Sequence, residues 1–170
     1  MQERPGPVSE APCPQRLASL LLCPFATAGV TVTKESARLF RMDGKRLDGL
    51  TLVPWQSGKS LCWDVTGICS LAYINAAHEA GAAAELAASH NKEKYADLNS
   101  RYLFEPIAVE TLGVLSSSAN SLFKEIGNKI SLNTRESREV SFLHQHILVL
   151  VQRFNAILLH DFLPTIDCSD

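Results

Sequence analysis

The chain has 170 residues, of which 46% are hydrophobic and 20% are charged, and its formal net charge is −2. This composition supports one packed domain and excludes a wholly disordered protein. The charge argues against a strongly basic nucleic-acid-binding surface, although a local basic patch remains compatible with it. The five cysteines form no CxxC pair and fit neither a disulfide framework nor a structural zinc site. We therefore expect reduced thiols in an intracellular protein, nuclear or cytoplasmic.

The N-terminal segment offers little to bury. Residues 1–16 are rich in Pro and Glu and predict a disordered lead-in. The apolar run that follows stops at Pro24, far short of the ~20 residues needed to span a bilayer, and no short basic segment precedes it. We therefore expect neither secretion nor membrane insertion. From there to Lys34, the sequence suits a frayed helix followed by a short strand.

Two strands and a tight turn are predicted next. Residues 47–53 form the first strand, which Pro54 stops, and residues 60–66 form the second, which Gly67 ends. Between them, residues 56–59 have the composition of a hairpin turn. The two strands are therefore expected to pair antiparallel.

An Ala- and Glu-rich segment over 73–98 predicts a helix, with only Gly81 against it. A third strand is predicted over 102–109. It is apolar on both faces apart from Glu105, which suits a buried, central position in the sheet.

Two amphipathic helices, over 117–130 and 135–162, close the chain. The second is apolar over more than one stripe, so it is either buried or partly exposed as a homodimer surface. The order ββ-α-β-α-α predicts an α/β fold with a small mixed β-sheet and flanking helices. We place this domain over 30–164, between a disordered or degenerate segment over 1–29 and a tail over 165–170.

The predicted hairpin brings Asp48 and Asp64 close together. They lie eight positions either side of Gln56, so the turn sets them opposite or diagonal to each other. Such pairs have Cβ atoms roughly 4.5–8 Å apart, which lets two carboxylates share a hard cation such as Mg²⁺. Aspartate is disfavoured within strands, so two aspartates that face each other indicate a functional site. The alternative is that one or both lie at a strand end in solvent.

Lys92 and Lys94, followed by Tyr95, offer a cation for such a site. Because the two lysines are two positions apart on a helix, they point to nearly opposite sides, and at most one can face the hairpin. The alternative is that both lie in solvent, where they are favourable in the last turn of a helix.

These residues carry a family resemblance. The run MDGKRLDGLTLVPW over 42–55 resembles an R-P-D-x-x-x-x-P-W signature, and GKSLCWDVT follows over 58–66. The Ala-rich helix then ends in Lys-Tyr, and FEPIAVETLG occupies 104–113. In order and spacing, this series resembles the PD-(D/E)xK restriction-endonuclease-like domain of retroelement, reverse-transcriptase-associated origin that occurs in animal open reading frames. The resemblance covers roughly residues 30–164.

The resemblance implies a magnesium-dependent endonuclease that nicks DNA. Asp48 and Asp64 would bind the metal together with a backbone carbonyl near Val65. A lysine on the helix, Lys92 or Lys94, would replace the usual strand lysine, with Tyr95 beside it.

Several positions depart from the family pattern. Leu47 stands where the signature has Pro, and Thr66 stands where the usual motif has its lysine, as in this subgroup generally. Asn91 replaces a basic residue of the helix, and Gly67 interrupts a β-branched stretch. Two further hypotheses therefore stay open: a catalytically inactive relic of the same fold, and a helical protein-interaction module with a small hairpin.

Overall fold

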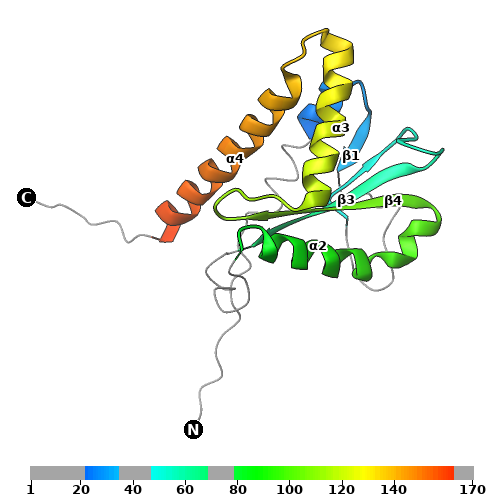
Figure 1. Cartoon of the computed structure of the whole chain (residues 1–170). Coiled ribbons are helices and arrows are strands. Elements are labelled where there is room, and N and C mark those ends of the chain that lie inside the picture. The colour runs from blue at the N-terminus through cyan, green and yellow to red at the C-terminus, as the bar shows by residue number, and fades with distance from the viewer. Residues whose placement is uncertain (1–21, 35–46, 69–78, 163–170) are drawn as a thin grey trace, which may run out of the picture.

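A computed structural model describes residues 22–34, 47–68 and 79–162 of the chain (Figure 1). Its named helices and strands are β1 (Val32–Lys34), β2 (Gly49–Thr51), β3 (Ser60–Ile68), α2 (Ala82–Lys94), the 3-10 helix η3 (Ala96–Ser100), β4 (Tyr102–Glu110), α3 (Ser117–Thr134) and α4 (Glu139–Phe162). The lead-in predicted over 1–16 and the tail predicted over 165–170 lie outside the described ranges.

The four strands form one sheet in the order β1-β2-β3-β4. Strand β2 runs antiparallel to both β1 and β3, and β3 and β4 run parallel. Helix α2 lies on one face of the sheet, and α3 and α4 lie on the other (Figure 1). The predicted α/β class with a mixed sheet and flanking helices is confirmed, and the short strand expected before Lys34 joins the sheet as β1.

The hairpin turn between β2 and β3 is confirmed. The backbone N–H groups of Gln56 and Lys59 donate to each other's carbonyls, and Ser57 and Gly58 between them both have positive φ. This is the geometry that two-residue hairpin loops require. The predicted end of the second strand at Gly67 is wrong, because parallel pairing with β4 carries β3 on to Ile68.

Helix α2 is shorter than predicted. It begins at Ala82 because Gly81 adopts a left-handed conformation, with φ of 91°, at the N-cap. At the other end, the α-helix stops after Lys94 and a 3-10 turn follows over Ala96–Ser100. The predicted residues 73–78 lie outside the described part of the chain.

Strand β4 was predicted to be central, and within the described sheet it lies at an edge. It is nevertheless buried, because α2 and α3 pack on its two faces. Its outer edge is also occupied: the carbonyl of Pro106 accepts from Ser118 Oγ at 2.9 Å, and that of Ala108 accepts from Ser116 N at 3.0 Å. Because Pro106 has no N–H and these two carbonyls are hydrogen-bonded, the edge of β4 offers fewer backbone groups to which another strand could pair.

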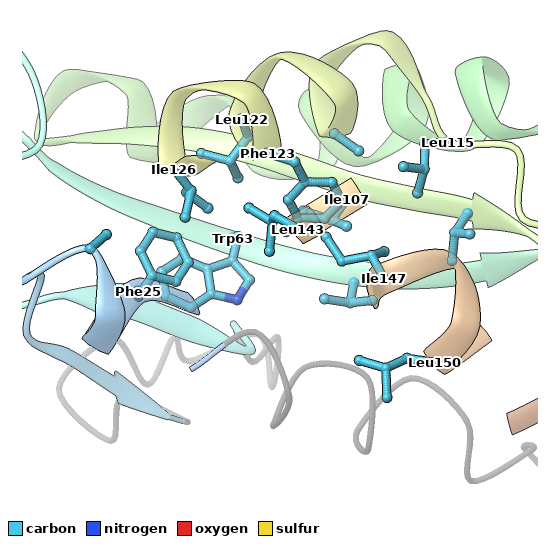
Figure 2. Packing of buried hydrophobic residues seen from close by; sticks show 14 of the residues in the cluster. Phe25, Trp63, Ile107, Leu115, Leu122, Phe123, Ile126, Leu143, Ile147 and Leu150 are labelled. Carbon is cyan, nitrogen blue, oxygen red and sulfur yellow. The ribbon is translucent and has the colours of Figure 1, made fainter. Parts of the chain in front are cut away.

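The hydrophobic core begins before the predicted domain boundary at residue 30. Residues 22–27 are helical, and Phe25 is fully buried and stacks on Trp63, with ring centroids 4.6 Å apart (Figure 2). The helix and short strand expected before Lys34 are therefore both present.

Helices α3 and α4 form an antiparallel pair. Helix α3 extends to Thr134, and Arg135, predicted to open the last helix, instead caps α3 in a left-handed conformation. Gly127 lets the two helices approach, since a Cβ there would lie 2.8 Å from the backbone of Val140. Among the described helices, none is long and apolar enough to cross a bilayer.

Candidate functional site

The hairpin brings Asp48 next to Asp64. The strand register pairs Gly49 with Trp63 and Leu50 with Cys62. Continuing this register by one residue sets Asp48 opposite Asp64. Two bonds hold it there, since Asp48 N donates to Trp63 O at 3.0 Å and Asp48 Oδ2 accepts from Val65 N at 2.7 Å. Asp48 thus contacts the residues on either side of Asp64.

Both aspartates face α2. Side chains alternate along β3, so Asp64 points to the side opposite Trp63 and Val65, which lie in the core under α3 and α4. Asp64 lies in the middle of its strand and is half-buried, whereas Asp48 immediately precedes β2. The alternative that one or both acids lie at a strand end in solvent therefore fails for Asp64, whereas Asp48 does lie at a strand end, where it is half-buried.

Burial raises the pKa of Asp64 from its ordinary value of 3.8 to about 7. The neighbouring Asp48 carboxylate raises this pKa further, and the Lys94 ammonium lowers it. The charge of Lys94 therefore offsets only part of the effect that burial and Asp48 have on the pKa of Asp64.

Lys94 is the lysine whose charge lowers the pKa of Asp64. Its Nζ lies 4.7 Å from the centre of the Tyr95 ring, a cation–π distance. Tyr95 is fully buried and packs on Phe104, with ring centroids 4.7 Å apart. Its ring is thus a fixed support beneath the ammonium, and a chemical role for its hydroxyl remains a prediction.

Lys92 lies on the other side of α2, as the two-residue spacing predicts. It is exposed and lowers the pKa of Glu105, a half-buried carboxyl whose pKa burial raises. Both lysines are candidates for the site, and only the charge of Lys94 acts on the pKa of Asp64. Lys92 instead borders a cavity of about 330 Å³ between α2, β4 and α3, lined by Glu85, Ala88, Ser89, Lys92, Glu105, Ser117, Ser118 and Ser121.

A further pair, Asn91 and Thr66, lies beside the acids. Asn91 is buried on the face of α2 that packs on the sheet, and its Nδ2 donates to Thr66 Oγ1 at 2.8 Å. Helical periodicity could have found it, because Asn91 lies four residues before Tyr95 and shares its face. The comparison with the family pattern identifies Asn91 only as a departure from it.

Val65 contacts the site through its backbone and not through its side chain. Its side chain is buried in the core, and its N–H binds the Asp48 carboxylate. The contribution of its carbonyl to a metal site remains a prediction.

The acids suit magnesium better than zinc. In the described part of the chain, no three His, Cys, Asp or Glu side chains come together as a closed metal cage. Mg²⁺ does not need one, since it is usually bound by one or two carboxylates with waters and substrate phosphates completing its shell. Asp48 and Asp64, opposite each other in the hairpin register, fit that requirement.

No protein-family model matches the chain, and no curated protein does. What the protein does is therefore inferred from the chemistry of this site and from the sequence resemblance.

Proposed function

We propose that the protein is a retroelement-derived, nuclease-like domain that hydrolyses DNA phosphodiesters with Mg²⁺ bound by Asp48 and Asp64. The observation that carries this proposal is the register of the hairpin, which sets two carboxylates side by side on the face covered by α2. Two half-buried carboxylates at this spacing can act together as oxygen ligands of a hard divalent cation. A cation-dependent function explains why both acids stand there.

Each residue of the site has a distinct task. Asp48 is fixed by the Val65 N–H, and Asp64 is held mid-strand by the β3–β4 ladder. Lys94, resting on Tyr95, offers an ammonium that neutralises charge on a phosphoryl oxygen. When bound, Mg²⁺ supplies Lewis-acid activation of the phosphate and lowers the pKa of a bound water.

Nicking of supercoiled plasmid DNA tests the proposal. The wild-type protein should nick in Mg²⁺ and stop when EDTA is added. Asp64→Asn should lower the rate by roughly 10²-fold or more, the size of effect that losing one charge-stabilising group produces. Glu93→Gln, which changes an exposed carboxylate on α2, is the matched control and should cut normally. Nicking by Asp64→Asn at the wild-type rate would show that another protein or site is responsible.

A second candidate is a catalytically inactive relic that still binds the cation. The residue type at position 91 favours it, because Asn91 stands where the family resemblance expects a basic residue. In that case the wild-type protein gains thermal stability from Mg²⁺ but does not nick, and Asn91→Lys restores nicking. The four-stranded sheet, by contrast, is more than a helical module with a small hairpin needs.

A further inference from the structure

We infer that the Thr66 hydroxyl donates a hydrogen bond to the phosphate being hydrolysed, and that Asn91 is the positioning residue that orients this hydroxyl. The inference rests on the proposed nuclease function and deepens it. It concerns two residues that bear no charge.

Thr66 is placed to reach the reacting phosphate. It lies two residues after Asp64 on β3, so the two side chains leave the same face of the sheet, about 7 Å apart along the strand. Thr66 is half-buried, and its hydroxyl lies on the α2 side of the sheet, where it accepts from Asn91. A phosphate held beside a cation on Asp48 and Asp64 would lie within reach of this hydroxyl.

Asn91 determines which way the hydroxyl points. A threonine hydroxyl has two lone pairs and a single hydrogen. The Asn91 amide donates to one lone pair at 2.8 Å, so the hydroxyl's own hydrogen must point away from that N–H. The bond thus leaves the hydroxyl hydrogen of Thr66 available to a group other than the Asn91 amide.

The position of Asn91 is costly unless it serves this purpose. The other buried residues of α2 are alanines: Ala83, Ala84 and Ala88. An amide on such a face must be desolvated and loses side-chain freedom, whereas alanine would avoid both costs. The residue it holds is the one that replaces the strand lysine of the usual motif.

The chemical role is hydrogen bonding and not proton transfer. The oxygen of a water molecule forms a bond to phosphorus and loses a proton to solvent, while the bond from phosphorus to the leaving oxygen breaks and that oxygen takes up a proton. Thr66 keeps its own proton and donates a hydrogen bond to a non-bridging phosphoryl oxygen, where negative charge develops.

The test compares Thr66→Val, Thr66→Ser, Asn91→Leu and the double variant Thr66→Val/Asn91→Leu. For each, plasmid nicking gives kcat and KM, and the rise in melting temperature on adding Mn²⁺ reports cation binding. Thr66→Val should lower kcat by about 10²-fold with KM and the Mn²⁺ effect unchanged, and Thr66→Ser should restore most of the rate. Asn91→Leu should lower kcat about 10-fold, and the double variant should be no slower than Thr66→Val, because Asn91 acts only through Thr66.

Wild-type kcat in Thr66→Val would overturn the inference while leaving the nuclease proposal standing. A double variant whose losses multiply would equally overturn the role of Asn91. If Thr66→Val does not fold, the Asn91→Leu and Thr66→Ser pair decides: a normal rate in Asn91→Leu contradicts the inference. A wild-type protein that binds Mn²⁺ but nicks nothing removes both this inference and the nuclease activity.

Discussion

Asp64 carries a stability cost at neutral pH that follows directly from its surroundings. Its pKa is about 7 in the folded protein, whereas an exposed aspartate has a value of 3.8. Below pH 4, folded and unfolded chains are both protonated, and Asp64 costs nothing. Between pH 4 and 7 the unfolded chain releases its proton while the folded one retains it, so stability falls as the pH rises, and above 7 the cost is constant.

Asp64→Asn should therefore stabilise the metal-free protein at pH 8 and have little effect at pH 4. The gain at pH 8 should be at least about 1 kcal/mol, since each pKa unit corresponds to ~1.4 kcal/mol. Chemical denaturation at both pH values measures it, with Glu93→Gln as the exposed control. An equal effect of Asp64→Asn at pH 4 and pH 8 would show that its carboxyl is not desolvated in solution.

The two lysines of α2 form a natural pair of test and control. Lys94→Met should lower the nicking rate by roughly 10²-fold, because it removes the ammonium whose charge lowers the pKa of Asp64. Lys92→Met removes the same charge two residues away, on the side of Glu105, and should cut at nearly the wild-type rate. The reverse result would place the site on the other side of α2.

Periodicity explains why part of the site could be predicted. The placement of Asp48 opposite Asp64 follows from the two-residue repeat of a hairpin, and the opposite directions of Lys92 and Lys94 follow from the helical repeat. The bond between Asn91 and Thr66 depends instead on how α2 packs on the sheet. Neither the strand repeat nor the helical repeat predicts that packing.

At the scale of elements, the backbone of β2 at Gly49 packs closely against the ring of Trp63 on β3. A Cβ on Gly49 would lie 2.0 Å from the Trp63 ring, so no side chain fits there. Gly67 in β3 differs, since a Cβ there would meet nothing within 4 Å.

Gly49→Ala should therefore destabilise the protein by about 3 kcal/mol or more, because the tryptophan or the strand must move. Gly67→Ala should be neutral or stabilise by up to ~1 kcal/mol, since glycine weakens a strand. Thermal unfolding of the two variants measures the contrast. Equal stability of both would contradict the close packing of Gly49 on Trp63.

The errors in predicting the elements have local physical causes. The predicted helix over 73–98 treated Gly81 as tolerated, whereas its left-handed backbone sets the start of α2. Strand β4 was expected to be central because it is apolar on both faces. Helices cover both of its faces, so an edge strand acquires the composition of a central one.

At the scale of the whole molecule, α4 leaves apolar side chains in solvent. Leu143, Ile147 and Leu150 are buried against the core, while Phe142 is 46% and Val149 is 64% exposed. This is the surface on which the sequence predicts a homodimer.

Val149→Asp should weaken such a dimer without affecting the fold, because the side chain is 64% exposed. Light scattering over a range of concentrations would show the wild-type protein moving toward twice its monomer mass and the variant remaining monomeric. A wild-type protein that stays monomeric at ~100 μM would rule out α4 as a stable dimer surface.

The extent of the domain was the least predictable part of the fold. Phe25 lies in a segment that looks dispensable in sequence, yet it is fully buried and stacks on Trp63 (Figure 2). Its burial comes from a contact between residues far apart in the chain, for which a short apolar run gives no signal.

The central claim is that Asp48 and Asp64 bind one divalent cation. A crystal structure of the protein grown with Mn²⁺, with anomalous scattering measured to locate the metal, tests it most directly. We expect one anomalous peak on the order of 2 Å from an oxygen of each aspartate, and its loss in Asp64→Asn crystals. A wild-type structure with no peak between the two carboxylates, or with the metal elsewhere, would contradict the account.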